Sequence, residues 1–284
     1  MNKILEKERL SKDVYRMVLE EPAIARARRA GQFVIVMADE ASERIPLTIA
    51  DADPDAGTLT IIFQAVGAST RVLAAKEQGQ PVAHVLGPLG RPTRIEKRPG
   101  SVVCVCGGIG AAPMYPIVQA HKAAGNEVVV ILGARNAELL ILEEELRELA
   151  DELIVVTDDG SKGRKALVTE PLKELCGSAT PPSEAIAIGP PIMMKFCAAA
   201  TKGFGVPTVA SLNTIMVDGT GMCGGCRVTV DGRIKFVCVD GPEFDAHLVD
   251  WDSMLRRLGT YKEEEAHKCR LVEAAAALGQ ERER

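Results

Sequence analysis

Between residues 101 and 202, short hydrophobic strands alternate with helices, and this alternation constrains the fold more than any other feature of the chain. The expected strands are residues 101–106, 127–132, 153–157 and 185–188. The expected helices are residues 111–124, 137–150, 167–175 and 191–202. Strands and helices at this spacing predict a parallel, doubly wound α/β sheet, with ligand sites in the crevice at the carboxyl ends of its strands.

The residues before this segment predict a different architecture, a small antiparallel β barrel or sandwich. Residues 31–37 and 58–63 are rich in β-branched and aromatic side chains, as strands are. One short helix is expected over 69–76, with Ser69 or Thr70 as its N-cap. Several short strands spaced this closely are typical of a barrel or sandwich.

We therefore expect three domains. A β-barrel domain covers residues 1–97, an α/β domain covers 98–205, and a small C-terminal domain covers 206–284. The C-terminal domain holds a cysteine cluster, a hairpin that joins 227–230 to 233–237 and a terminal helix over 263–278.

Composition excludes several classes of function. The 34 lysines and arginines against 39 aspartates and glutamates give a net charge of −5 with no long basic run, so nucleic-acid binding is not expected. No apolar stretch approaches the roughly 18 residues that a membrane span needs. The first residues lack the apolar core of a secretory signal, which predicts a cytoplasmic protein. In that reducing compartment, eight cysteines are not expected to form a disulfide framework.

Three of the cysteines crowd together and predict a metal centre. Cys223 and Cys226 form a C-x2-C pair on a loop with glycines at 219, 221, 224 and 225, and Cys238 follows twelve residues after Cys226. Glycines let two thiolates converge on one centre and expose backbone N–H groups to sulfur. The plant-type iron–sulfur spacing C-x4-C-x2-C…C would place a further ligand at position 218, which is Asp218.

Three interpretations of this cluster remain open. A [2Fe–2S] cluster held by Asp218, Cys223, Cys226 and Cys238 matches the spacing best. A structural zinc site with the same ligands is the second. Reduced thiols on a glycine-rich loop are the third. His247, Asp240 and Asp231 are rival fourth ligands.

Two glycine turns follow expected strands and could bind a nucleotide. Gly107-Gly108-Ile109-Gly110 opens a helix, where backbone amides and the helix N-terminus suit a pyrophosphate. Gly189-Pro190 would line the same crevice. Neither turn is a G-x-G-x-x-G motif, and a purely structural strand-to-helix turn is the alternative for the first.

Two segments of the barrel domain could bind phosphate. Arg44 stands beside a strand that carries Thr48, and arginine is a good bidentate partner for phosphate. The small residues from Gly67 to Thr70 lie at an expected helix N-terminus, another anion-binding geometry. Each segment could equally be an ordinary surface loop.

Taken in order, these motifs resemble those of the ferredoxin-reductase-like flavoproteins. Arg44-x-Pro46-Leu47-Thr48 looks like the flavin motif of that family, and Gly67-x-Ser69-Thr70 looks like its second flavin-phosphate segment. The nucleotide turn of the family is similar to residues 107–113. The cysteine-rich tail narrows the resemblance to the electron-transfer subunits of dihydroorotate dehydrogenase B and their relatives. Asp218 makes it closest to the small subunit of NADH-dependent ferredoxin:NADP oxidoreductase.

The resemblance implies FAD in the first domain, NAD(H) in the second and a [2Fe–2S] cluster in the third. The residues implied for FAD are Arg44, Pro46, Leu47, Thr48, Gly67, Ser69 and Thr70. Those implied for NAD(H) are Gly107, Gly108, Gly110, Asp158 and Gly189. Many relatives carry a cysteine directly before the Gly-Pro turn, where this chain has Ile188, so no thiol is expected at the point of hydride transfer.

The resemblance also implies a function and a partner. Hydride would pass between NAD(H) and FAD, and single electrons between FAD and the cluster, in a complex with a larger flavoprotein subunit that carries [4Fe–4S] clusters and reacts with ferredoxin. NAD is favoured over NADP by resemblance only, because Arg135 and Glu138 point to opposite preferences. The alternatives are a subunit that serves a dihydroorotate dehydrogenase and a non-catalytic, zinc-stabilised NAD-responsive module.

Overall fold

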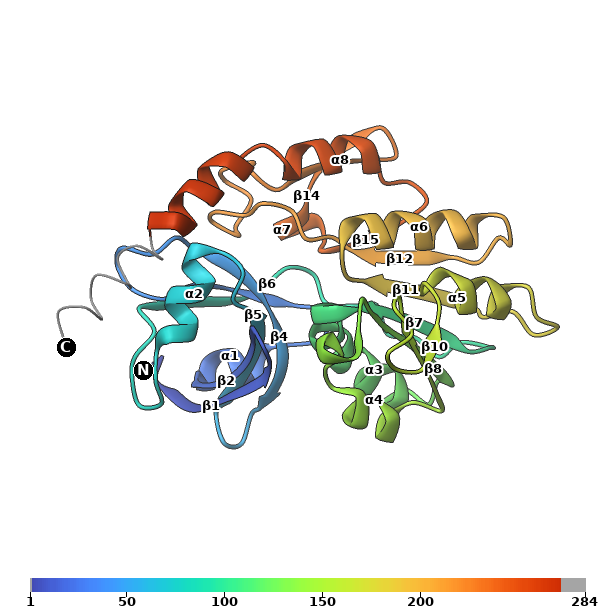
Figure 1. Ribbon diagram of the computed structural model, residues 1–284, viewed down its shortest axis with the longest axis horizontal. Coiled ribbons are helices and arrows are strands. Elements are labelled where there is room, and N and C mark those ends of the chain that lie inside the picture. Colours follow the sequence, from blue (N-terminus) through green and yellow to red (C-terminus); the bar gives the residue numbers. More distant parts are fainter. Residues whose placement is uncertain (1, 272–284) are drawn as a thin grey trace.

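The first ninety residues form the expected antiparallel barrel. The computed structural model describes residues 2–271 (Figure 1). Six strands follow the order β1-β2-β5-β4-β3-β6, and their bounds are β1 Ile4–Ser11, β2 Val14–Glu20, β3 Phe33–Met37, β4 Ile45–Asp53, β5 Thr58–Gln64 and β6 His84–Leu89. An isolated bridge between Lys3 and Pro81 brings the segment before β6 back to β1, so the two edges of the sheet meet. The inside is filled by fully buried side chains such as Met17, Ile61 and Phe63.

Two short helices accompany the barrel, α1 (Pro22–Ala27) and α2 (Ala68–Ala75). The expected helix over 69–76 is confirmed, but the expected cap is wrong. The N-cap is Gly67, and the hydroxyl of Thr70, three residues later, accepts a hydrogen bond from the Gly67 N–H at 3.0 Å. Thr70 therefore closes the cap from inside the first turn.

The predicted doubly wound sheet is confirmed, with seven strands in the order β10-β9-β8-β7-β11-β12-β15. The parallel strands are β7 Val102–Gly107, β8 Val128–Ala134, β9 Glu152–Thr157, β10 Arg164–Lys165, β11 Glu184–Ile188 and β12 Thr208–Ser211. Strand β15 (Glu243–Asp245) pairs antiparallel with β12. The strand sequences are nearly all hydrophobic because both faces of the sheet are covered.

Helices cover the two faces of this sheet in pairs (Figure 1). α3 (Ala111–Ala123) and α4 (Glu143–Leu149) pack on the face that includes Cys104 and Cys106, which are structural core residues. α5 (Thr169–Cys176) and α6 (Pro191–Lys202) pack on the opposite face, around Val103 and Ile131. Two one-turn 3-10 helices, η1 (Gly108–Gly110) and η2 (Ala137–Leu139), follow β7 and β8.

The helix expected over 137–150 is wrong in its extent. Leu142 has φ +56°, a left-handed conformation that breaks the helix, and α4 begins only at Glu143. Three glutamates occupy the first turn of α4, where negative charge interacts favourably with the helix dipole.

The described part of the C-terminal segment combines a hairpin, three helices and the two last strands of the sheet. Its remaining elements are β13 Arg227–Val230, β14 Arg233–Phe236, α7 Val237–Asp240 and α8 Trp251–Leu258. Asp231 and Gly232 both have positive φ, as a two-residue hairpin turn requires. Residue 237, expected in the second strand, begins α7 instead. Residues 262–271 are helical, and the part of the expected helix beyond 271 lies outside the described residues.

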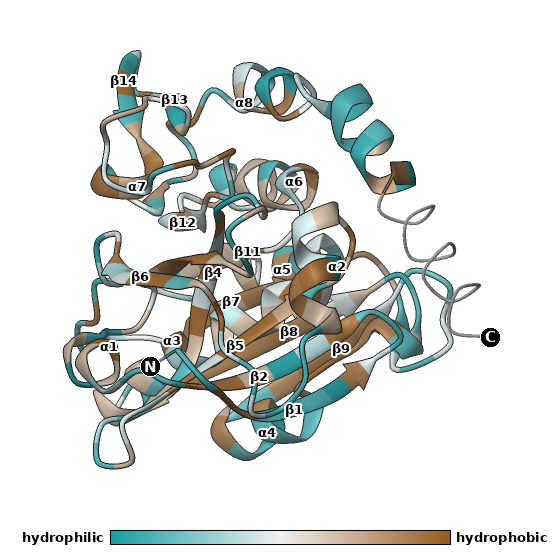
Figure 2. Ribbon diagram, turned by 90° about the vertical axis from the view of Figure 1, so that its left-hand side faces the viewer, coloured by the Kyte–Doolittle hydropathy of each residue, from teal (hydrophilic) through white to brown (hydrophobic). Residues whose placement is uncertain are grey.

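This terminal helix is polar where it is described. Figure 2 shows that the strands of both sheets are mainly hydrophobic, whereas most of the helix over 262–271 is hydrophilic. Lys268 forms an ion pair with Glu43 in the loop before β4, so the helix contacts the barrel. Among residues 2–271, none of the helices combines the length and the apolar character that crossing a bilayer requires.

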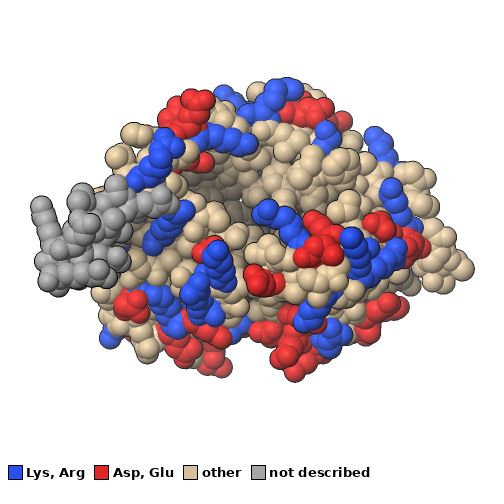
Figure 3. Space-filling model, viewed as in Figure 1, with Lys and Arg blue, Asp and Glu red and all other residues tan. Residues whose placement is uncertain are grey.

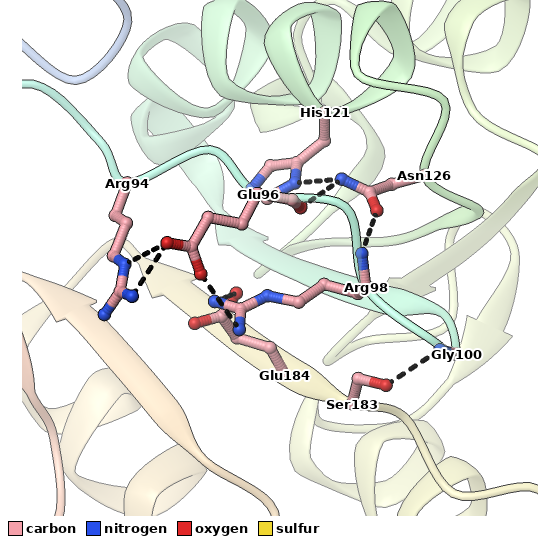
Figure 4. A network of polar contacts seen from close by, with 8 residues as sticks. All are labelled: Arg94, Glu96, Arg98, Gly100, His121, Asn126, Ser183 and Glu184. Carbon is pink, nitrogen blue, oxygen red and sulfur yellow. Dashed lines mark hydrogen bonds and ion pairs between the residues drawn. The ribbon is translucent and has the colours of Figure 1, made fainter.

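The linker between barrel and sheet, residues 91–99, is fixed by buried polar contacts (Figure 4). Asn126 accepts from the Arg98 N–H at 2.7 Å and donates to the Glu96 carbonyl at 2.9 Å. Arg98 also forms an ion pair with Glu184 at 2.9 Å. Burial, with the charge of Arg98, lowers the pKa of His121 to about 4, so its neutral ring pairs with the Asn126 amide at 3.0 Å. These contacts fix the barrel's connection to the sheet.

Candidate functional site

A cleft of about 660 Å³ opens at the carboxyl ends of β7, β8 and β9. We call it the strand-end cleft. Gly107 and Gly108 come from the end of β7, Arg135 follows β8, and Asp158 follows β9. The opposite wall is apolar and includes Leu139, Leu167, Ile192, Met193 and Phe196. Open α/β sheets bind ligands at this edge, and the structure places three predicted nucleotide residues, Gly107, Gly108 and Asp158, in its wall.

In the turn after β7, two of the glycines are required for different reasons. Gly108 has φ +54°, and a Cβ there would meet no atom within 4 Å, so its backbone faces open space. At Gly110 a Cβ would lie 2.3 Å from the Ile188 carbonyl oxygen, so only glycine lets the turn pack against the end of β11. α3 follows at once with no acidic residue in its first turn, which suits an anionic ligand.

The loops after β8 and β9 are tied to each other. Asp159 accepts hydrogen bonds from the N–H and the hydroxyl of Ser161, and these contacts lower the pKa of Asp159. The Ser161 hydroxyl in turn accepts from the Ala137 N–H at 2.8 Å. The contacts hold the edge that carries Arg135 and Asp158, both exposed side chains that a bound ligand can reach.

A second cleft, of about 450 Å³, lies between the barrel and the sheet, and we call it the interdomain cleft. Six predicted cofactor residues lie in its wall: Pro46, Leu47, Thr48, Thr70, Gly110 and Gly189. Three do not: Arg44 is exposed at the start of β4, Gly67 caps α2, and Ser69 is buried. The four flavin-motif residues in this wall come from the barrel, whereas Gly110 and Gly189, which were predicted for NAD(H), come from the α/β domain.

The two clefts meet at a neck formed by Gln64, Ile109 and Pro190, which line both. Gln64 ends β5, and of these three residues it is the one whose side chain carries hydrogen-bonding groups. Sequence reasoning missed it, because the residue stands at the end of an expected strand with no motif around it. The only available signal was a polar side chain directly after the buried run Ile61-Ile62-Phe63.

The predicted metal residues lie in two pairs. Asp218 accepts from the Cys223 N–H at 2.8 Å and from the Thr220 N–H at 3.0 Å, which lowers the pKa of its carboxyl. The Cys226 and Cys238 sulfurs are 3.2 Å apart, and the Cys238 N–H donates to the Cys226 sulfur. Burial and this neighbouring thiol raise the pKa of Cys238. Within residues 2–271, no three histidine, cysteine or acidic side chains converge as ligands of one ion.

This arrangement bears on the rival ligands and on the metal. Asp240 accepts from the Phe236 N–H, and the His247 ring pairs with the Thr201 hydroxyl on α6. Asp231 lies in the hairpin turn. Two pairs of donors fit a two-iron cluster better than one tetrahedral ion, which needs four donors around a single point.

The loop over 218–226, which carries Asp218, Cys223 and Cys226, packs against the barrel. Gly219 has φ +74°, and a Cβ there would lie within 2.8 Å of Ile35 on β3 and Leu89 on β6. The residues just before the loop line the interdomain cleft: Ser211, Leu212, Asn213, Thr214 and Met216. Figure 3 shows the molecule hollowed beneath the arch of α8 and the helix over 262–271, with mainly uncharged residues inside.

Comparisons with known proteins agree with this geometry. Residues 104–199 match the oxidoreductase NAD-binding domain, and residues 213–250 match the iron–sulfur cluster binding domain of dihydroorotate dehydrogenase B. The Thermotoga maritima homologue of the dihydroorotate dehydrogenase B (NAD(+)) electron transfer subunit is 47% identical over 93% of each chain. The Desulforamulus reducens electron transfer subunit is 34% identical, over 88% of this chain and 97% of its own.

A solved structure extends the comparison. A chain from the structure of the NADH-dependent reduced ferredoxin–NADP oxidoreductase, described for flavin-based electron bifurcation, superimposes with a TM-score of 0.90. The two are 45% identical over 95% of this chain and 97% of the other. These matches confirm the resemblance that the motifs predicted. The chain belongs to the family of the electron-transfer subunits of dihydroorotate dehydrogenase B and their homologues, ferredoxin-reductase-like oxidoreductase subunits.

Proposed function

We propose that the chain is an electron-transfer subunit that exchanges hydride between NAD(H) and FAD and passes single electrons between FAD and a [2Fe–2S] cluster. The observation that carries this proposal is the contiguity of three sites. The strand-end cleft and the interdomain cleft share wall residues, Gln64 among them, and the segment just before the cluster loop lines the interdomain cleft through Thr214 and Met216. A flavin supplies the conversion between two-electron and one-electron transfer.

The interdomain cleft is the FAD site in this proposal. Pro46, Leu47 and Thr48 would hold the flavin from the barrel. Gly110 and Gly189, which were predicted for NAD(H), line the same cleft from the α/β domain and would face the flavin there. Thr70 places a hydroxyl and the N-terminus of α2 at the same wall, which suits a phosphate. Arg44, Gly67 and Ser69 complete the predicted set from outside the wall, with Arg44 as the cation for a phosphate.

The strand-end cleft is the NAD(H) site. Gly107, Gly108 and the N-terminus of α3 offer amides to a pyrophosphate, and Asp158 lies where a ribose hydroxyl would be reached. Gln64 is placed to hydrogen-bond the carboxamide of a nicotinamide that enters the neck, and so to orient it toward the flavin. No thiol participates, since Ile188 precedes Gly189.

The cluster would be held by Asp218, Cys223, Cys226 and Cys238. The donor set is one carboxylate and three sulfurs, arranged as the pairs Asp218–Cys223 and Cys226–Cys238. The Gly225 N–H already donates to the Cys223 sulfur at 3.4 Å, as the amides around an iron–sulfur cluster do.

The partner is a larger subunit, as for the electron transfer subunits among its relatives. We infer that this subunit is a flavoprotein with [4Fe–4S] clusters and that the pair couples NADH, NADPH and ferredoxin by electron bifurcation. The 45% identity over nearly the whole chain to a chain of the NADH-dependent reduced ferredoxin–NADP oxidoreductase, whose structure was described for flavin-based electron bifurcation, supports this. Service to a dihydroorotate dehydrogenase is the second candidate, supported by the names of the other relatives.

An anaerobic optical and EPR titration of the purified chain tests the function. We expect flavin bands and iron–sulfur absorbance, both bleached by NADH, with an EPR signal from the reduced cluster. A colourless protein that binds zinc would instead support a non-catalytic NAD-responsive module. Co-purification of the native chain then separates the two candidate partners, because the bound larger subunit can be identified directly.

A further inference from the structure

Two arginines hold consecutive peptide groups of the Cys223–Cys226 loop. Arg227, the first residue of β13, donates from Nη1 to the Gly224 carbonyl at 3.2 Å. Arg257, in the last turn of α8, donates from Nη2 to the Gly225 carbonyl at 3.1 Å. The two carbonyls lie between the predicted cluster ligands, and the guanidinium groups reach them from different elements of the fold.

The contact of Arg227 continues to a ligand sulfur. The Gly224 carbonyl belongs to the same peptide group as the Gly225 N–H, and this N–H donates to the Cys223 sulfur at 3.4 Å. A cation on the oxygen of a peptide group polarises that group and strengthens the hydrogen bond that its N–H donates. The guanidinium of Arg227 thus acts on the Cys223 sulfur through one peptide group.

Neither charge is neutralised nearby. Across the described range 2–271, no acidic side chain forms an ion pair with Arg227 or Arg257. Arg257 is half-buried against the loop and α8, which reduces the screening of its charge by water.

We propose that Arg227 and Arg257 are positioning residues that raise the reduction potential of the cluster. The inference rests on the proposed function, because it requires a cluster at Asp218, Cys223, Cys226 and Cys238. Reduction adds one negative charge to the site, and a nearby fixed cation favours the more negative state. Hydrogen bonds to ligand sulfur act in the same direction.

The second arginine also couples the cluster to the rest of the chain. α8 packs through the buried Trp251 and Met254, and Arg257 lies in its last turn, just before the short segment that leads to residues 262–271. A displacement of α8, for instance on binding the larger subunit, would change the distance from the guanidinium to the Gly225 carbonyl. The potential of the cluster would then respond to assembly.

The test is an EPR-monitored redox titration of the cluster-loaded full chain and of three variants. Arg227→Gln and Arg257→Gln remove one charge and one contact each. Arg256→Gln is the matched control, since this exposed neighbour on α8 carries the same charge and, within the described residues, donates no hydrogen bond to the loop. We expect the midpoint potential to shift to more negative values in the first two variants and to stay unchanged in the control.

Each other outcome is decisive. Equal shifts in all three variants would show that net charge alone changes the potential. No shift in any variant would show that the two arginines do not affect it. Either result would overturn the inference. The potential is read only from loaded molecules, so partial loss of iron does not obscure it. Arg227→Lys and Arg257→Lys keep the charge, so their midpoint potentials should stay closer to that of the wild type than those of the glutamine variants. Lysine variants with potentials as negative as those of the glutamine variants would also overturn the inference. A wild-type chain without an iron–sulfur signal would refute the proposed function itself.

Discussion

The hydroxyl of Thr93 donates a 2.5 Å hydrogen bond to the carboxylate of Glu243, 150 positions away in the sequence. Thr93 belongs to the linker between barrel and sheet, and Glu243 begins β15. Gly31 leaves the space that both side chains occupy, since a Cβ there would lie 2.2 Å from the Thr93 oxygen. The contact therefore joins the barrel, the linker and the C-terminal segment at one point.

Glu243 should make stability depend on pH. Burial raises the pKa of this carboxyl from 4.5 to about 7, with a smaller contribution from Glu184. Between these values the unfolded chain loses a proton that the folded chain retains, so stability falls as pH rises through this window and then stays level. The loss is on the order of 3 kcal/mol.

Glu243→Gln cannot ionise at this position, so its free energy of unfolding relative to that of the wild type should be higher at pH 8 than at pH 4.5. Urea unfolding at a series of pH values measures the difference. Asp245→Asn, on the exposed part of the same strand, is the control and should keep the wild-type pH dependence. Parallel curves for Glu243→Gln and the wild type would show that Glu243 does not titrate in this range.

Gly110→Ala and Gly108→Ala should separate packing from backbone conformation in the glycine turn. The first places a methyl group 2.3 Å from the Ile188 carbonyl and should cost about 3 kcal/mol of stability or more, with weaker NADH binding. The second meets no neighbour but requires φ +54°, which costs about 1–2 kcal/mol. Thermal unfolding and NADH titration of both variants check the order, and a larger loss at Gly108 would contradict it.

Asp218 should set both the retention and the potential of the cluster. Carboxylate oxygen is a harder donor than thiolate, so Asp218→Cys should retain the cluster at a lower potential. Asp218→Ala should lose most of its iron, because it also removes the acceptor for the Thr220 and Cys223 N–H groups. Asp218→Asn keeps an acceptor for those groups without the negative ligand. If iron content and EPR spectrum are the same in all three variants, Asp218 is a loop residue.

Arg44 should contribute to FAD affinity although it lies outside the wall of the interdomain cleft. It stands two positions before Pro46, which is in that wall, and its side chain is exposed. Loss of a charge-assisted contact to phosphate should weaken FAD binding by about 2 kcal/mol, roughly thirtyfold. Equilibrium dialysis of Arg44→Ala against Arg26→Ala, an exposed arginine on α1, measures this. Equal affinities would assign the phosphate to other groups.

The architecture was predictable because its signals are local. Buried runs such as 101–106 bracket glycine turns that allow few conformations, and the barrel strands carry β-branched and aromatic residues. The break at Leu142 was not predictable, because residues 137–150 have good helix propensity and only tertiary packing of Ile141 and Leu142 in the core interrupts the helix.

The candidate site divides in the same way. Motif residues such as Thr48 and Gly110 could be named because a cofactor constrains the residue types around them. Gln64, Arg257 and Glu243 could not, since each acquires its role from a neighbour more than thirty positions away or from a cleft that exists only once two domains pack. Single sequences carry no trace of such pairings.

The antiparallel strand β15 has a consequence for how this protein can be taken apart. Because β12 and β15 complete the sheet beside β11, the iron–sulfur segment is part of the α/β sheet and not a separate domain joined by a linker. Removing this segment would leave the backbone N–H and C=O groups along one side of β11 unpaired. Strands of other chains could then pair with this exposed sheet edge. The strand pairing that stabilises the sheet thus also fixes the distances between the redox sites. A rearranged or truncated chain would therefore lose its electron-transfer path together with its fold.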